Sequence, residues 1–401
     1  MNTSNARDRH LQLRKEVFLG VLLALSSACD RKPPAESVPD AAPPSASTVD
    51  SSAPAPSTSL PPVLPAKRTL RLVAAGDVSF GRLVGQMLLQ NPQFAPLASV
   101  DPLFRTADIR FVNLEGPISD RGKETVSPEN KLVFNGPPIS ASALSRARVD
   151  IVSTANNHAW DYGRKGLLET LDFLDKEKIF HVGSGENLEK AWTPVVVERS
   201  GFRLAFVAVN DIWNQAHVPG NSARDHVAGM DKDKLVGLVR ELRRRDDVDA
   251  IAVSYHGGVE CQDEPLTTTR DLARAAIEAG ADVFLGHHPH VVQGIAFHRD
   301  RPIVYSLGNL LMRMTGDHPA TEMGLAVRVT LRRGEVPELV ACPIRISGVD
   351  PIPLGSDPRR TAYESMFMQR LRKVTRLVGQ ANFEAFDAEG CSRVTSGERS
   401  P

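Results

Sequence analysis

Residues 283–290 read Val-Phe-Leu-Gly-His-His-Pro-His, and this stretch sets the interpretation of the whole chain. The apolar run Val283–Leu285 is typical of a short buried β-strand. The run ends in a glycine followed by three histidines, of which His288 and His290 are separated by one residue. Because alternate residues of an extended segment point to the same side, we expect the imidazoles of His288 and His290 to face one ligand together.

The same pattern, an apolar run that ends in polar residues, recurs at five other places. Ligands of open α/β sheets bind at the carboxyl ends of the strands, so these endings are expected to converge on one site. A single polar ending would indicate only a turn, whereas six in one chain favour a shared site. The other five are Leu70–Ala75 before Asp77, Ile109–Val112 before Asn113 and Glu115, Asp150–Thr154 before Asn156, Asn157 and His158, Ala250–Ser254 before His256, and Ile303–Ser306 before Asn309.

Helical periodicity alternates with these runs and predicts an α/β fold. Gly201 lies between the strand-like runs Pro194–Glu198 and Leu204–Val209 and predicts a hairpin, so part of the sheet is expected to be antiparallel. After about Ile344 no further strands are expected, and the last residues are expected to fray. The helical patterns are Gly163–Lys176, Lys232–Arg245, Thr267–Ala279 and Arg359–Val378.

The residue types at the strand ends favour a divalent metal ion. Carboxylate, amide oxygen and imidazole together suit Mn²⁺, Fe²⁺ or Zn²⁺, and the absence of thiolates from these endings argues against a structural zinc site. One or two ions are expected. A pair of ions that shares Asp77 would polarise a phosphoryl or carbonyl oxygen and generate hydroxide near neutral pH.

The first 67 residues predict export and a tether. Residues 1–29 contain basic residues, an apolar run at Val17–Leu25 that is too short to span a bilayer, and small residues before Cys29, so they resemble a signal peptide with a lipobox-like end. We predict lipidation of Cys29, with ordinary secretory cleavage as the alternative. Proline, alanine and serine dominate residues 30–67, which predicts a disordered linker. The folded part is therefore expected outside the cytoplasm, anchored to a bacterial membrane at the periplasm or cell surface.

Charge and cysteine content bound the partners and the compartment. The chain has 48 basic and 48 acidic side chains, so it has no general attraction to nucleic acid, and no nucleic-acid partner is expected. Beyond Cys29 the chain contains Cys261, Cys342 and Cys391, which allow one disulfide in an oxidising compartment. The sequence does not indicate which two cysteines would pair.

Taken in order, the strand-end motifs resemble the CapA family of poly-γ-glutamate capsule synthesis proteins. That family belongs to the metallo-dependent phosphatase (calcineurin-like) superfamily. The resemblance implies a four-layer α/β/β/α sandwich, which we assign to residues 68–350. The helical pattern at Arg359–Val378 predicts a C-terminal helix and tail at 351–401. The motifs are Gly76-Asp77 with Arg82, Asn113-Leu114-Glu115, Asn156-Asn157-His158 with Asp161 and Gly163, His256-x-Gly258-x-Glu260, Gly286-His287-His288-Pro289-His290, and Ser306-Leu307-Gly308-Asn309.

The resemblance also implies roles for individual residues. His158 would protonate the leaving group. His287, to which the resemblance assigns no role, is predicted to support the ligands, and the alternative is that it binds the metal itself. The superfamily's Asp-x-His is absent before Asp77, so Glu115 is predicted to take its place. The alternative for Glu115 is a salt bridge to Arg82 or Arg110. The metal ligands implied or predicted in this way are Asp77, with a bridging role, Glu115, Asn157, His256, His288 and His290.

Two further residues have a predicted role with an open alternative. Asp161 either orients His158 or caps the helix that follows it. Arg82 is a candidate clamp for an anionic substrate, because a planar guanidinium suits phosphate and carboxylate, and the alternative is a solvated charge at a helix start. Gly257 stands where CapA-like chains usually carry tryptophan.

Two functional hypotheses follow from these residues. The first is an exported metal-dependent hydrolase or transferase, with a phosphoester-like or amide-bond centre, in the synthesis or processing of a capsule or cell-envelope polymer resembling poly-γ-glutamate. Its substrate would be an anionic polymer or a phosphoester, and capsule-synthesis membrane proteins are the expected partners. The second is a non-catalytic accessory subunit of an envelope polymer complex that retains the metal-binding fold, which the missing Asp-x-His keeps open.

Overall fold

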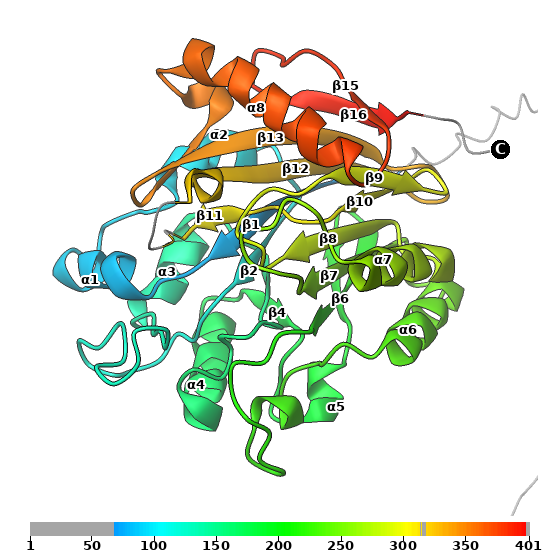
Figure 1. Cartoon of the computed structure of the whole chain (residues 1–401). Coiled ribbons are helices and arrows are strands. Elements are labelled where there is room, and N and C mark those ends of the chain that lie inside the picture. Colours follow the sequence, from blue (N-terminus) through cyan, green and yellow to red (C-terminus); the bar gives the residue numbers. More distant parts are fainter. Residues whose placement is uncertain (1–67, 313, 315–317, 398–401) are drawn as a thin grey trace, which may run out of the picture. The chain divides into compact units, whose positions relative to one another are not determined.

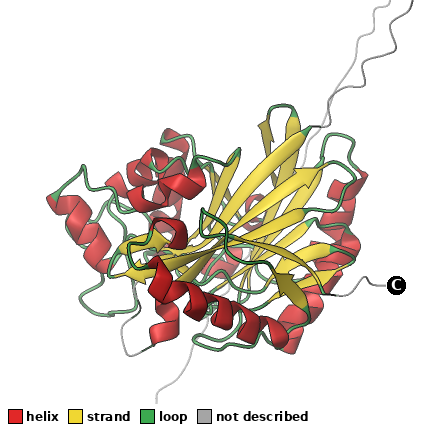
Figure 2. Ribbon diagram, turned by 90° about the horizontal axis from the view of Figure 1, so that it is seen from above, coloured by secondary structure: helices red, strands yellow, loops and turns green. Residues whose placement is uncertain are grey.

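Two β-sheets lie face to face between two layers of helices in the computed structural model, which describes residues 68–312, 314 and 318–397 (Figures 1 and 2). These residues belong to one compact unit. The predicted signal peptide at 1–29 and the predicted linker at 30–67 lie outside the described residues. None of the helices in the described part of the chain is long and apolar enough to cross a membrane.

The larger sheet has ten strands, with β1 (Thr69–Val78) near its centre. β1 pairs in parallel with β2 (Ile109–Leu114) and β11 (Asn309–Leu311), and antiparallel with β12 (Met323–Arg332). The remaining strands are β3 (Ile151–Ser153), β4 (Phe180–Val182), β13 (Glu338–Ser347), β14 (Asp350–Pro353), β15 (Ala381–Phe383) and β16 (Ser392–Ser396). Their order is β15-β16-β13-β12-β1-β2-β3-β4, with β14 beside β13.

The smaller sheet has six strands in the order β5-β6-β7-β8-β10-β9. Its first two strands form an antiparallel hairpin through Gly201, whose φ is 73°, so the predicted hairpin is confirmed. Glycine is favoured there because left-handed backbone is strained for other residues. The strands are β5 (Val195–Arg199), β6 (Phe202–Asn210), β7 (Ala250–His256), β8 (Val283–His287), β9 (Ile295–His298) and β10 (Arg301–Val304).

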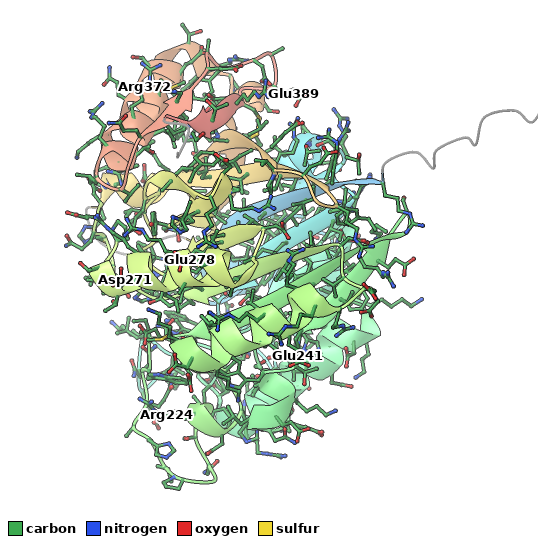
Figure 3. The ribbon with its side chains drawn as sticks, turned by 90° about the vertical axis from the view of Figure 1, so that its right-hand side faces the viewer. Arg224, Glu241, Asp271, Glu278, Arg372 and Glu389 are labelled. Atoms are coloured by element: carbon green, nitrogen blue, oxygen red, sulfur yellow. A yellow bond between two sulfur atoms is a disulfide. The ribbon has the colours of Figure 1, made fainter. Side chains whose placement is uncertain are left out.

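Helices cover the outer faces of both sheets. Helices α1 (Arg82–Gln90), α3 (Ile139–Arg146) and α4 (Gly163–Lys176) lie on the larger sheet, whereas α6 (Lys232–Arg244) and α7 (Thr267–Ala279) lie on the smaller one. On α6 and α7 the charged residues Glu241, Asp271 and Glu278 are exposed (Figure 3). The other helices are α2 (Asp101–Phe104), α5 (Leu188–Ala191) and α8 (Arg360–Arg376).

Three buried layers hold this arrangement together. Apolar side chains of both sheets meet in the middle, where the rings of Phe111 and Phe206 stack with centroids 5.5 Å apart. A second layer joins the larger sheet to α1, α3 and α4, and a third joins the smaller sheet to α6 and α7. Burial of this apolar surface is the main term that favours the fold. The four-layer α/β/β/α sandwich is therefore confirmed.

The expectation that strands stop after about Ile344 is wrong. β13 runs to Ser347, and β14, β15 and β16 extend the larger sheet. A disulfide joins Cys342 of β13 to Cys391, the residue before β16. β15 and β16 are short strands at the sheet edge, and β16 buries only alternate residues, so each carries little apolar signal.

Candidate metal centre

The larger sheet places three polar side chains next to one another. In the parallel pairing of its central strands, Asp77 of β1 lies opposite Asn113 of β2 and Asn309 of β11. A β-carbon at Gly76 would lie 1.9 Å from the carbonyl oxygen of Gly308, so only glycine allows the two segments to approach this closely. Asn113 Nδ2 donates a hydrogen bond to Asp77 Oδ1 over 2.9 Å. Strand register alone therefore aligns the oxygen-bearing residues.

The smaller sheet contributes the imidazoles. His256 at the end of β7 lies opposite His287 at the end of β8. The chain then turns sharply, because His288 and His290 have φ values of 95° and 57°. This turn brings His290 Nδ1 to within 3.4 Å of Asp77 Oδ2, and it brings the His288 ring to 4.9 Å from the His256 ring. The two sheets thus meet at one buried centre.

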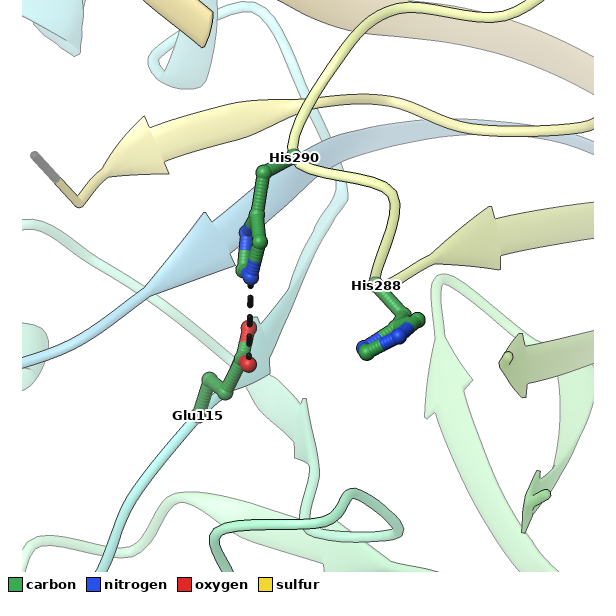
Figure 4. Close-up of side chains that lie close together, drawn as sticks. All are labelled: Glu115, His288 and His290. Atoms are coloured by element: carbon green, nitrogen blue, oxygen red, sulfur yellow. Dashed lines mark ion pairs between the residues drawn. The ribbon is translucent and has the colours of Figure 1, made fainter. Parts of the chain in front are cut away.

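Glu115, directly after β2, lies at the middle of this centre and is fully buried. Its Oε1 lies 3.7 Å from His290 Nε2 and 3.8 Å from His256 Nε2. Figure 4 shows Glu115 facing His290, with His288 beside them. Two groups offer ligand atoms within 4.8 Å of one another: Glu115 with His288 and His290, and Asp77 with Glu115 and His256. Glu115 is common to both groups, whereas Asp77, the predicted bridging residue, belongs to only one of them.

Several buried polar atoms of the centre have no hydrogen-bond partner within the described protein. They are both carboxylate oxygens of Glu115, Nδ1 of His288 and Nε2 of His287. A buried polar atom without a partner is unfavourable, and for a carboxylate the penalty is large. A divalent cation would satisfy Glu115 and His288, which belong to one candidate ligand group, whereas His287 belongs to neither group. Carboxylate and imidazole donors are those that Mn²⁺, Fe²⁺ and Zn²⁺ accept. The residues present fit a metal ion.

The protonation of the two carboxylates differs. Burial alone would raise the pKa of Asp77, but hydrogen bonds and charge from His287 and His290 outweigh it and hold that pKa well below its ordinary value. Burial raises the pKa of Glu115 to about 8, although the positive charge of His290 opposes the shift. Asp77 is thus the permanent anion, and Glu115 holds a proton near neutral pH until a cation displaces it.

The imidazoles differ in the same way. Burial lowers the pKa of His256 well below its ordinary value, and burial with the nearby His290 lowers the pKa of His288 to about 4. Burial would also lower the pKa of His290, but the charges of Glu115 and Asp77 raise it to about 9. His256 and His288 are therefore neutral at pH 7, the form that binds a metal.

The neighbours of His290 and Asn157 define how these two residues are oriented. His290 Nδ1 lies 3.0 Å from Asn309 Oδ1, which leaves Nε2 facing Glu115. Holding one ring nitrogen of a ligand histidine in this way fixes the other toward the metal. Asn157 Oδ1 lies 2.8 Å from His256 Nε2, so Asn157 reaches the centre, and its assignment as a ligand stays a prediction.

His158 and Asp161 form a pair at the edge of the centre. His158 Nδ1 lies 2.8 Å from Asp161 Oδ2, and the same carboxylate oxygen accepts a hydrogen bond from Phe134 N over 2.7 Å. The helix α4 has no side-chain cap, so Asp161 orients His158 and does not cap this helix. Burial alone would lower the pKa of His158, but the hydrogen bond and charge of Asp161 raise it.

The ring of Phe134 lies between Arg82 and His158. Its guanidinium lies 4.2 Å from the centroid of the Phe134 ring, and Phe134 packs on the ring of His158 at 4.6 Å. Arg82 does not pair with Glu115; it donates to the carbonyl of Lys131, and Arg110 pairs with Asp150. A cavity of about 650 Å³ lies here, with Ser79, Arg82, Val84, Phe134, Met312 and Ile346 in its wall.

The nine predicted site residues are therefore gathered in one region, with the six predicted ligands at its centre. Sequence reasoning gave no role to Asn214 and Gln215, whose side chains contact Asn157 and Asp161 from the loop after β6. No local signal marks them, because a loop without periodicity reaches the site only through the tertiary fold. At Gly257 a β-carbon would lie 2.4 Å from the Tyr255 hydroxyl, which explains the glycine at this position.

The chain is similar to several known proteins. The family model "Bacterial capsule synthesis protein PGA_cap" matches residues 71–314. The PGA biosynthesis protein CapA of Bacillus subtilis (strain 168) is 28% identical over 286 residues, which cover 70% of this chain and 73% of that protein. The capsule biosynthesis protein CapA of Bacillus anthracis is 27% identical over 293 residues, with coverage of 72% and 70%.

Two more distant similarities complete the comparison. A probable polyglutamine synthesis accessory protein of Mycobacterium tuberculosis (strain H37Rv) is 26% identical over 218 residues, which cover 51% of this chain and 55% of that protein. Among solved structures, the sulfate thiohydrolase SoxB of Thermus thermophilus superposes with a TM-score of 0.41 at 13% identity. That match covers 79% of this chain and 62% of the SoxB chain, so this chain spans less than two thirds of it.

Proposed function

This chain belongs to the PGA_cap family of bacterial capsule synthesis proteins, and on that premise we propose that it is an exported, metal-dependent hydrolase or transferase that acts on a cell-envelope polymer. The observation that carries the proposal is the buried carboxylate of Glu115, which has no hydrogen-bond donor and is surrounded by imidazoles. A protein that only needed to fold would not gain from burying such a group without a partner.

Six residues would hold the metal. A divalent ion bound there supplies Lewis acidity and lowers the pKa of water toward neutrality. The chain itself contributes a fixed negative charge at Asp77 and neutral imidazoles at His256 and His288. Glu115 and His290 must lose their protons when the ion enters. The full predicted set is Asp77, Glu115, Asn157, His256, His288 and His290.

His158 would act as the general acid. Asp161 holds Nδ1, so the opposite ring nitrogen, Nε2, is the one that can transfer a proton. Asp161 also raises the pKa of His158, which keeps the imidazole protonated nearer neutral pH. A proton donor held in this way protonates a leaving group and typically contributes 10²–10⁴-fold to the rate.

The cavity that Arg82 lines supports a proposal for the substrate, although none of the six predicted ligands lies in its wall. Arg82 contributes positive charge to its wall, and Val84, Met312 and Ile346 contribute apolar surface. A substrate with an anionic group and a short aliphatic segment, as in a polymer of acidic residues, would satisfy both parts of the wall. An anionic polymer or a phosphoester is therefore the proposed substrate class.

The direct test measures metal content and phosphodiesterase and amidase activity of the purified chain, with Asp77→Ala as the comparison. We expect the wild type to bind Mn²⁺ and to hydrolyse a model substrate, and the variant to lose both properties. If wild type and Asp77→Ala were equally metal-free and equally inactive, the proposed enzyme function would be wrong.

A second candidate function is a non-catalytic accessory subunit of an envelope polymer complex. The Asp-x-His of the superfamily is missing before Asp77, and the mycobacterial relative is described as an accessory protein. The enzyme would need His158 as a proton donor, whereas the accessory subunit would not. His158 is not a predicted metal ligand, so its substitution separates the two functions. If His158→Gln abolished polymer production while metal content stayed the same, catalysis would be favoured. Unchanged production would favour the accessory role.

The proposed location is outside the cytoplasm, with lipidated Cys29 as the membrane anchor and membrane proteins of capsule synthesis as partners. The disulfide Cys342–Cys391 supports an oxidising compartment, because such bonds are rare in the cytosol. We expect Cys29→Ser to release the protein from the membrane fraction. Mass analysis must establish cleavage, because an unprocessed signal peptide would also retain the protein. Retention of a cleaved variant would contradict the lipid anchor.

A further inference from the structure

The C-terminal helix α8 contacts two chain segments that adjoin the imidazoles of the site, one that follows His256 and one that contains His288 and His290. We call residues 257–266, which follow His256, the first histidine segment, and residues 288–294 the second histidine segment. The family model ends at residue 314, so family membership assigns no role to α8. We propose that Arg370 of α8 is a positioning residue that holds the two histidine segments together and thereby sets the geometry of the metal centre. The proposal rests on the function proposed above.

One guanidinium bridges the two segments. Arg370 Nη1 lies 2.6 Å from Asp263 Oδ1 in the first histidine segment, and Nη2 donates a hydrogen bond to the carbonyl of Val292 in the second over 3.0 Å. The side chain of Arg370 is only 11% exposed. Two donors on one planar group fix the distance between their acceptors, which a single ammonium group cannot do.

The second histidine segment needs such support because its backbone is strained. His288 and His290 adopt positive φ values, 95° and 57°, and such strained residues persist only where the surrounding structure imposes the conformation. Val292 is two residues beyond His290, so a displaced Val292 carbonyl would let His290 relax away from Glu115. The strained turn and the contact that restrains it are thus close in sequence.

The two histidine segments are also joined directly, so a restraint on one acts on the other. Cys261 N donates to the carbonyl of Pro289 over 2.9 Å, and Gln293 Nε2 donates to the carbonyl of Gln262 over 2.9 Å. Pro289 lies between the two metal-facing histidines. Arg370 therefore adds a further link between two segments that already share two hydrogen bonds. One of these segments contains the strained turn.

The end of α8 fixes the exit of the second histidine segment. A β-carbon on Gly294 would lie 2.4 Å from Val378 Cγ2 and 2.5 Å from the carbonyl oxygen of Val374, so the helix and this segment are in direct contact. Ile295 N donates to Thr375 Oγ1 over 3.2 Å. The same helix thus holds the second histidine segment at Val292 and holds Ile295, the residue directly after it.

The competing explanation is a surface ion pair that contributes little. It fits Lys373, whose Nζ lies 2.9 Å from Asp263 Oδ2 while its side chain is 63% exposed, because exposed pairs are weak. It does not fit Arg370, which is nearly buried and bonds to a main-chain carbonyl as well as to a carboxylate.

The test measures amide hydrogen exchange by mass spectrometry in the full chain without metal, which reports local opening. For Arg370→Ala we expect at least about tenfold faster exchange in residues 259–263 and 289–295, with no change in β2. Arg372→Ala is the matched control, because Arg372 is exposed on the same helix and should change neither segment (Figure 3). Arg370→Lys keeps the charge beside Asp263 but offers one nitrogen, so it should protect residues 259–263 better than 289–295.

Calorimetry with Mn²⁺ provides the second readout. Arg370→Ala should raise the dissociation constant about tenfold to a hundredfold, the range expected for one hydrogen bond to a charged group, and Arg372→Ala should leave it unchanged. Unchanged exchange, an equal rise in all peptides, or faster exchange with an unchanged dissociation constant would overturn the proposal. If Arg370→Ala does not fold, Asp263→Asn takes its place, and faster exchange is expected in residues 259–263 and 289–295. The absence of this change would overturn the proposal. A wild type that binds no Mn²⁺ but shows the expected exchange pattern would refute the proposed function while supporting the restraint by Arg370.

Discussion

The two sides of the metal centre are built differently. On the larger sheet, Asp77 lies in β1 and Glu115 directly after β2, and neither has a positive φ. On the smaller sheet, His288 and His290 lie beyond the end of β8 in a turn with positive φ values. The oxygen side and His256 therefore follow from strand order and register, whereas His288 and His290 depend on contacts from elsewhere in the chain. We therefore expect Asp77 and Glu115 to supply the negative charge that holds a cation, and the turn at His288 and His290 to set the geometry of the site.

Glu115→Gln should have the largest effect. The substitution preserves shape but removes the charge common to both candidate ligand groups. We expect Mn²⁺ affinity to fall at least about a thousandfold, equivalent to about 4 kcal/mol. The measurement is thermal unfolding with and without Mn²⁺, in which the wild type should be stabilised by the ion and the variant should not. Glu260→Gln is the control, because Glu260 is exposed near the centre. If Mn²⁺ stabilised the wild type and Glu115→Gln equally, the expectation that the oxygen side supplies the charge for the cation would be wrong.

His158→Gln should have the next largest effect, on turnover alone. Loss of the proton donor should lower kcat about 10²–10³-fold, while metal content stays the same because His158 is not a predicted ligand. Asp161→Asn should lower the pKa of His158, so that a smaller fraction of the imidazole is protonated near neutral pH. A variant that lost metal together with activity would place His158 among the ligands.

Metal affinity should rise with pH. In the metal-free centre the pKa of Glu115 is raised to about 8 and that of His290 to about 9, so both hold protons at pH 7. An entering ion must displace these protons, and each proton released changes the apparent affinity by about tenfold per pH unit below its pKa. Affinity should therefore increase up to about pH 9 and then level off. Calorimetry in buffers of different ionisation enthalpy counts the protons, and a count of zero would contradict these protonation states.

Removal of the disulfide should have the smallest effect on the centre. Cys342→Ser with Cys391→Ser should lower the free energy of unfolding by about 2–4 kcal/mol, since the bond spans 49 residues, but should change Mn²⁺ affinity little. Denaturant unfolding provides the measurement, and Cys261→Ser is the control because Cys261 is free. A large loss of affinity would show that the edge of the larger sheet supports the site more directly than the contacts indicate.

The parts of the molecule that could be predicted from sequence are those with a local pattern. The helices Gly163–Lys176 and Thr267–Ala279 were predicted with their observed ends, because each has a regular apolar stripe. The predicted site residues lie together because parallel strands end at one edge. β12 to β16 lie outside the strands predicted above, and the pairing of Cys342 with Cys391 depends on the register of β13 and β16. No local sequence pattern predicts the turn at His288 or the contact between Asn214 and Asn157.

The separation of the site residues along the chain has a consequence for how the protein acquires its metal. Asp77 and His287, which contact each other directly, are 210 residues apart. No short stretch of the nascent chain can form the centre, so metal uptake has to follow completion of the fold. A ligand that binds only the folded state stabilises it by about 2.7 kcal/mol at a hundred times its dissociation constant. The supply of metal in the compartment would thereby regulate the lifetime of the folded protein as well as its activity.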